Sequence, residues 1–262
     1  MWSNVFFLVQ TYNFFTCFFF IGIQGYPDGW WYVFEVITEV LMILDFIGRW
    51  VIRVCFPAAW SEMYLLHDRG GITKFNFTIR LIASVPFSII ISSSVGQNTK
   101  VLHNLDVALL RLFKLMKFGQ VVEYFSVVDF KKRQISNYSI NRAIFVFYYF
   151  WCFNHFFASL WLFCARIDHP HPQVGDSLHG VGWLVMDRLH LYSHTIYDMY
   201  RDSFFFCFST MNGQNWGNIW ATTDLEFFIH SIIDIAGASV FIGYFLTFAT
   251  EWTLRSIPLY EN

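Results

Sequence analysis

Charged residues are scarce in this chain. Asp, Glu, Lys and Arg make up 14% of its 262 residues, whereas 56% are hydrophobic and 22% are aromatic. A soluble domain usually carries roughly 25% charged residues. A chain this apolar could not cover its surface in water, so we expect an integral membrane protein with lipid as the solvent for much of it.

Several functional classes lack the residues that they need. The net charge of -2 leaves no basic stripe for nucleic acid. We find no nucleophile–base constellation and no Gly-rich phosphate loop, and therefore predict no enzyme and no cofactor apart from bound lipids. The five cysteines form no CxxC pair and are expected to be reduced. No basic region precedes the first apolar run, so neither a cleaved signal nor a transit peptide is expected.

The histidines outside the apolar runs are not expected to form a metal site. They lack the tight ligand spacing of a zinc site, and the pair flanking Pro170 is better interpreted as a surface turn. We predict no bound metal. These histidines are His169, His171, His179, His190 and His194.

Long apolar runs dominate the remaining sequence and predict an all-α membrane protein. A helix needs about 20 apolar residues to cross a bilayer. The segment 203–211 is too short to span and is predicted to be re-entrant. The six expected transmembrane helices lie at about 5–23, 30–54, 75–92, 102–122, 143–165 and 227–249.

The loop charges predict an orientation. Basic residues gather between the second and third helices and between the fourth and fifth, whereas the polar stretch 166–202 is mostly acidic. The positive-inside rule then places both termini in the cytoplasm or its organelle equivalent. The sequence leaves open whether the membrane is the plasma membrane or an organelle membrane.

Charges inside the predicted spans indicate function, because they are costly in lipid. Arg111, Lys114 and Lys117 recur every third residue and form a basic spiral, although lysines at an ordinary helix end could also snorkel to headgroups. Glu35 and Asp45 of the second helix could neutralise this spiral. Asp45 also lies four residues before Arg49, so these two share a face.

This arrangement resembles the voltage-sensor domain of voltage-gated cation channels. The resemblance assigns Glu35 and Asp45 as the outer and inner counter-charges and Arg111, Lys114 and Lys117 as the sensor charges. Pro86-Phe87 matches the end of the third helix in that family.

A second motif resembles the pore loop of four-domain calcium and sodium channels. The family places a short helix before a Thr-Gly-Glu-Asp-Trp-like filter, and the potassium-channel filter is absent here. The resemblance implies a voltage-sensor-like bundle at 1–123, a connector at 124–141, and a pore-like domain at 142–262 with a polar turret at 166–202 and a re-entrant loop at 203–218. The filter-like residues are Asn212, Gly213, Gln214, Asn215 and Trp216.

Four features depart from the family pattern. Gln214 stands where the family has a filter carboxylate, and Arg80 stands where the third helix usually has an acid. Met42 replaces an aromatic residue, and the last helix has no asparagine. That helix instead carries His230 and Asp234 one turn apart. The pair could line a pore, but we favour a pair satisfied within the helix bundle or a contact with a partner.

These observations support three functional hypotheses. The first is a cation-channel subunit that forms a homotetramer and is gated by voltage. The second is a channel-derived, non-conducting subunit of a heteromeric membrane complex, such as a respiratory assembly of the mitochondrial inner membrane. The third treats the voltage-sensor half as a proton or cation route, which the retained pore loop disfavours.

Overall fold

The computed structural model describes twelve stretches of the chain and shows no strand within them. The described part is therefore all-α, as the apolar runs predict. The chain divides into two compact units, which consist of residues 1–20 with 25–131, and of residues 21–24 with 132–262. The described residues are 2–23, 29–56, 81–82, 84–86, 112–115, 138–168, 183, 195–214, 219–243, 245–246, 249–250 and 253.

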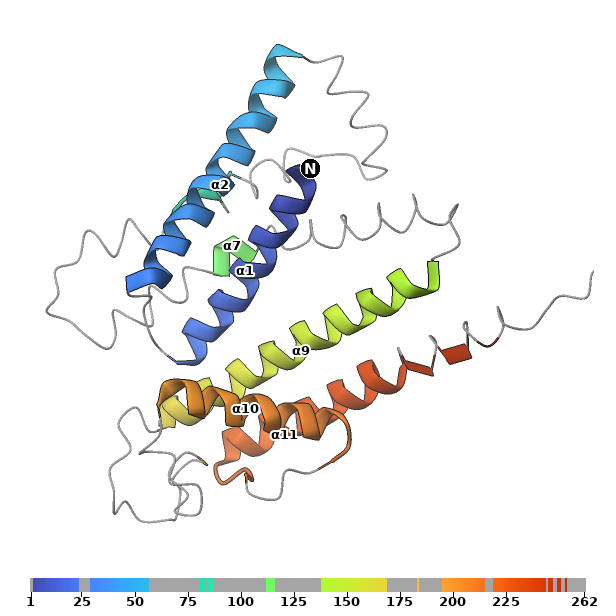
Figure 1. The fold of residues 1–262 in the computed structure, drawn as a ribbon. Coiled ribbons are helices and arrows are strands. Elements are labelled where there is room, and N and C mark those ends of the chain that lie inside the picture. Colours follow the sequence, from blue (N-terminus) through green and yellow to red (C-terminus); the bar gives the residue numbers. More distant parts are fainter. Residues whose placement is uncertain are drawn as a thin grey trace, which may run out of the picture. The chain divides into compact units, whose positions relative to one another are not determined.

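The first unit contains α1 (Trp2–Gly22), α2 (Gly29–Cys55) and the short α7 (Leu112–Leu115) (Figure 1). Two of these confirm the helices predicted at 5–23 and 30–54, with nearly the same bounds. Aromatic pairs join them: Phe19 and Trp31 stack with their centroids 6.5 Å apart, and Tyr12 lies 6.3 Å from Phe34. Most of the third and fourth predicted helices lies outside the described residues.

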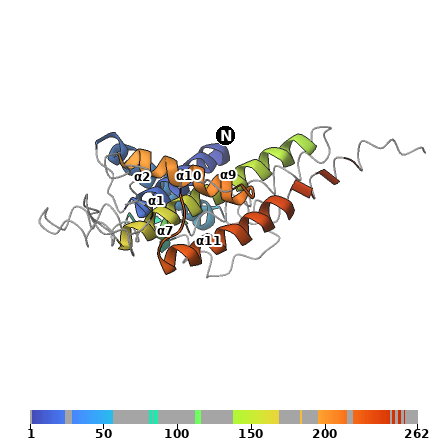
Figure 2. The ribbon, with the colours of Figure 1, turned by 90° about the horizontal axis from the view of Figure 1, so that it is seen from below.

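The second unit contains α9 (Tyr138–Asp168), α10 (Ile196–Met211), α11 (Asp224–Gly237) and the π-helix η3 (Ala238–Ile242). Each of α9, α10 and α11 packs against the other two, as two views agree (Figures 1 and 2). Their core is aromatic. Trp161 of α9 is fully buried and stacks on Phe206 of α10, with the ring centroids 4.6 Å apart.

Two described helices, at Val5–Gly22 and Ala143–Ile167, are long and apolar enough to cross a membrane. The described residues thus provide two candidate spans and leave the predicted six unconfirmed. The 27-residue α2 is also long enough, but it carries more charge than such a span usually does. Its charged residues are Glu35, Glu39, Asp45, Arg49 and Arg53.

Two helices of the second unit begin earlier than their apolar residues indicate. The predicted segment 203–211 is only the second half of α10, which begins at Ile196 within the polar stretch 166–202. The last helix, predicted at 227–249, begins at Asp224. In both cases a threonine cap starts the helix before the apolar residues do. The predicted domain boundaries stay a prediction.

Candidate functional site

The acidic residues of α2 lie on its buried face. Glu35, Glu39 and Asp45 are all buried, together with Met42. The opposite face of α2 is apolar and exposed, so this helix is polar inside and apolar outside. Glu39, which the sequence reasoning left out of its site, belongs to the same face, and its position one turn after Glu35 was the available signal. The exposed apolar residues include Trp30, Val33, Phe34, Ile37, Val40, Leu44, Ile47, Trp50 and Val54.

Asp45 forms an ion pair within its own helix. The Nε atom of Arg49 donates to both carboxylate oxygens of Asp45 at 3.0 Å. The side chain of Asp45 is 2% exposed, whereas that of Arg49 is 35% exposed. The guanidinium therefore links a buried carboxylate to the surface of the helix, as the four-residue spacing predicts.

Polar groups of α1 face the same interior. Gln10, Asn13 and Thr16 are buried, and the Asn13 amide donates to the Met42 sulfur at 3.1 Å. Met42, where the family would place an aromatic residue, thus packs against a polar side chain. Among the described residues, the first unit thus buries polar side chains beside apolar ones such as Phe6 and Phe20, while α2 exposes a largely apolar face.

The basic spiral falls largely outside the described residues. Arg111 and Lys117 are not described, and of Lys114 only the backbone in α7 is described. Pairing between these residues and Glu35 or Asp45 stays a prediction. The same holds for Arg80.

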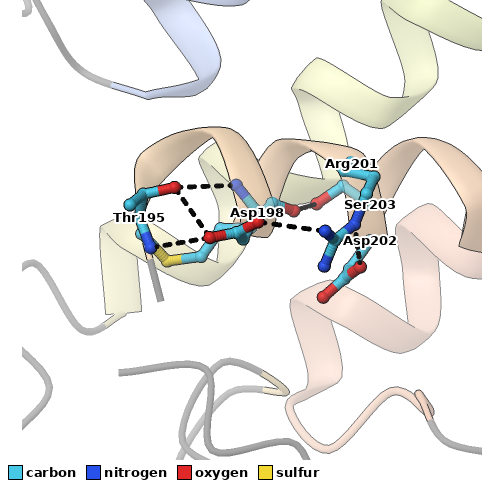
Figure 3. Close-up of polar contacts among 6 residues, drawn as sticks. Thr195, Asp198, Arg201, Asp202 and Ser203 are labelled. Atoms are coloured by element: carbon cyan, nitrogen blue, oxygen red, sulfur yellow. Dashed lines mark hydrogen bonds and ion pairs between the residues drawn. The ribbon is translucent and has the colours of Figure 1, made fainter. Parts of the chain in front are cut away.

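A capping box and two ion pairs start α10. The Thr195 hydroxyl accepts from the Asp198 N–H, and Asp198 accepts in return from the Thr195 N–H and hydroxyl (Figure 3). Arg201 donates to Asp198 and to Asp202, each at 3.0 Å. The hydrogen bond to Asp202, and then the nearby carboxylate charges, hold the pKa of Arg201 above its ordinary value. These polar contacts extend the helix beyond its apolar half.

The other end of α10 is a Schellman turn made by filter-like residues. The Gln214 N–H donates to the Ser209 carbonyl at 2.8 Å, and the Gly213 N–H donates to the Thr210 carbonyl at 2.9 Å. Gly213 has a φ of 73°, which favours glycine. Asn212 closes the helix, and Gln214 is exposed beyond it. Asn215 and Trp216 lie outside the described residues.

The chain then returns along α11. A Cβ atom built on Gly237 would lie 2.5 Å from the Cα atom of Met211, so the end of α10 touches the end of α11. Since α11 has 14 residues, the segment 212–223 carries the chain back by about 20 Å. With 16 residues, α10 is itself only about 24 Å long, which is shorter than the hydrocarbon layer.

The polar pair of α11 lies at the edge of the aromatic core. His230 Nδ1 is 3.6 Å from Asp234 Oδ2, and the Asp234 side chain is 51% exposed. The His230 ring lies against Phe206 and Trp161, with centroid separations of 5.5 and 6.3 Å. His230 thus packs against the aromatic core, whereas Asp234 is exposed. Whether it faces a pore or a partner stays a prediction.

No metal site is formed by the described His, Cys, Asp and Glu residues. The five predicted surface histidines at 169–194 lie outside the described residues. Cys55 is exposed and the other four cysteines are buried, and none of the five forms a disulfide. The buried four are Cys17, Cys152, Cys164 and Cys207.

No family model matches the chain. It is similar to the voltage-gated inwardly rectifying potassium channel KCNH6 of Gallus gallus, with 21% identity over 81% of this chain and 17% of the relative. The KCNH6 channel of Homo sapiens is 20% identical over 81% of the chain and 22% of the relative. The KCNH2 channel of Oryctolagus cuniculus is 21% identical over 81% of the chain and 18% of the relative.

These relatives are ion channels, and the chain spans about a fifth of their length. The similarity supports the predicted relationship to voltage-gated cation channels, although the relatives are potassium channels and the sequence motif resembles calcium and sodium channels. The chain is thus distantly similar to voltage-gated channels. This similarity and the two candidate spans together indicate a membrane protein.

Proposed function

We propose that this chain is a subunit of a cation channel in which α9, α10 and α11 form the pore-like unit. The observation that carries the proposal is the hairpin at α10: a helix too short to span ends beside the last residue of α11, and the chain then turns back. In lipid, a segment of this kind is tolerated where protein surrounds it or where it lines a water-filled cavity. The similarity to potassium channels over most of the chain supports the same function.

The first unit would serve as a voltage sensor. Its exposed apolar face on α2 suits lipid, and its buried Glu35, Glu39 and Asp45 suit basic groups from another helix. Arg111, Lys114 and Lys117 would be the moving charges. Glu35 and Asp45 would be the outer and inner counter-charges of this spiral, with Asp45 also held by Arg49.

In this proposal the subunit forms a homotetramer with six spans per copy. In a tetramer, the turns that follow α10 in the four copies would bring four Gln214 side chains together around the pore. Amides offer dipoles where carboxylates would offer charge, so we expect weak preference for calcium. The channel would lie in the plasma membrane or in an organelle membrane with its termini on the cytoplasmic side.

The second candidate is a non-conducting subunit of a larger heteromeric membrane complex, for example in the mitochondrial inner membrane. The observation that favours it is the chemistry of the turn: Asn212, Gly213 and Gln214 present no carboxylate at the described end of α10. The exposed aromatic residues of α9 and α11, such as Trp151 and Phe228, would then contact other subunits or bound lipid.

Reconstitution into a planar bilayer separates these two candidates. A channel predicts a cation current, and Gln214→Glu should raise the permeability of calcium relative to monovalent ions, whereas the neutral Gln214→Asn should not. Native mass spectrometry of the same preparation reports the number of copies. Tetramers that pass no current at any potential would contradict channel function, and one copy beside unrelated subunits would favour the accessory role.

A further inference from the structure

Glu226 carries a buried carboxylate at the start of α11 that makes contacts outside its own helix. The residue is 0% exposed. Its Oε2 atom accepts from the Thr222 N–H at 2.9 Å and from the Thr222 hydroxyl at 3.0 Å. Its Oε1 atom accepts from the N–H of Trp183, 43 residues earlier in the sequence, at 3.1 Å.

Helix capping alone does not account for these bonds. Glu226 is the third residue of α11 and completes a capping box with Thr223. The bond that belongs to that box, from the Thr223 N–H to Oε2, is the longest of the four at 3.4 Å. The shorter bonds reach the segment before the cap and a residue between α9 and α10. The carboxylate is therefore placed to serve three parts of the chain.

The bond to Trp183 fixes a residue of the aromatic core. The Trp183 ring is fully buried and stacks on Trp161 of α9, with an interplanar angle of 14°. The opposite neighbour of Trp161 is Phe206 of α10. Through Trp183, the start of α11 is connected to both other helices of the unit.

We propose that the Glu226 carboxylate is a positioning group that holds Trp183 and the return segment at Thr222 on the start of α11. The two oxygens divide the task, because Oε1 serves Trp183 and Oε2 serves the threonines. Removing the charge would release these contacts while α9 and the apolar half of α10 stay packed. This inference concerns the fold of the second unit and stands whether or not the protein conducts ions.

Hydrogen exchange of the full chain in lipid nanodiscs tests the inference. Glu226→Gln keeps the size but replaces one acceptor with an NH₂ group, so either Trp183 or the threonine pair must lose its acceptor. A bond to a charged acceptor is worth enough to slow exchange strongly. We expect exchange at the Trp183 amide, at the Thr222 and Thr223 amides, or at both, to become about tenfold faster.

Asp224→Asn is the matched control, because it removes an equal charge from an exposed position in the same helical turn. It should leave all three amides as in the unaltered chain, and peptides from 143–165 should not change in either variant. Unchanged exchange at all three amides in Glu226→Gln, or equal acceleration in the control or throughout α9, would overturn the proposal.

Thr222→Val and Thr222→Ser keep the test decisive if Glu226→Gln does not fold. Valine removes the hydroxyl donor to Oε2, whereas serine keeps it. In the valine variant we expect the Thr223 and Trp183 amides to exchange faster than in the unaltered chain. In the serine variant we expect their exchange rates to be unchanged. Equal exchange in both variants would contradict a carboxylate shared among the three segments.

Discussion

At the scale of single residues, buried charge distinguishes this chain from a soluble protein. Asp45 is almost fully enclosed and is paired with Arg49 in the next turn of α2. A buried carboxylate that loses its partner is costly, whereas removing both members costs much less. The contribution of the pair is therefore measurable as a coupling between the two positions.

We expect Asp45→Asn and Arg49→Gln each to lower the free energy of unfolding by about 1–2 kcal/mol, because each leaves a charge without its partner. The double variant should cost less than the sum of the two. Thermal unfolding in detergent micelles measures all three. Strict additivity would show that the two side chains do not interact in the folded protein.

Gly237 of α11 lies directly against Met211 of α10. In Gly237→Ala the new methyl group would meet the Cα, Cβ and backbone oxygen of Met211 at 2.5–2.9 Å. We expect a loss of about 1–3 kcal/mol in unfolding free energy, because the backbone of α10 must move.

Gly243→Ala is the control for this prediction. A Cβ there would meet no described atom within 4 Å, so alanine should be neutral or should stabilise the helix by up to about 1 kcal/mol. Equal unfolding temperatures for the two variants would contradict the close contact between Gly237 and Met211.

At the scale of elements, threonine caps decide where α10 and α11 begin. Thr195 and Thr223 each precede an acid by three residues, and both form capping boxes. Through its cap, α10 gains two turns ahead of its apolar half, in which Arg201 bridges Asp198 and Asp202. The length of the short helix therefore depends on polar contacts as much as on apolar packing.

Thr195→Ala should destabilise the first turn of α10 by about 1 kcal/mol, whereas Thr195→Ser should not, because serine keeps the capping oxygen. Hydrogen exchange of peptides covering 196–202 reports the change locally. Exchange that is the same in both variants would mean that α10 starts without help from the cap.

The sequence predicted the elements whose signal is a continuous apolar run. The bounds of α1 and α2 follow the runs closely, and α9 extends a few residues beyond its run at either end. The start of α10 was missed because apolar residues alone do not mark it, although the spacing from Thr195 to Asp198 was a local signal. The bond from Trp183 to Glu226 could not be predicted, because it joins positions 43 residues apart.

At the scale of the whole molecule, the two units have different interiors. Among the described residues, the first unit buries three acids of α2 beside polar and apolar side chains of α1, and the second buries an aromatic cluster around Trp161. Both patterns suit a protein in lipid, and both accompany a distant similarity to voltage-gated potassium channels. The sequence predicted the acids Glu35 and Asp45 by motif, but the described residues alone do not test their pairing with the basic spiral.

The central claim is that α10 enters the bilayer and that the chain returns to the same side. It is tested by single cysteines at Tyr197, Leu225 and Ser139, introduced into a chain with its native cysteines replaced by serine. A membrane-impermeant maleimide is then applied to either side of sealed vesicles. The account predicts that positions 197 and 225 are labelled from one side and position 139 from the other. Labelling of 197 and 225 from opposite sides would contradict it.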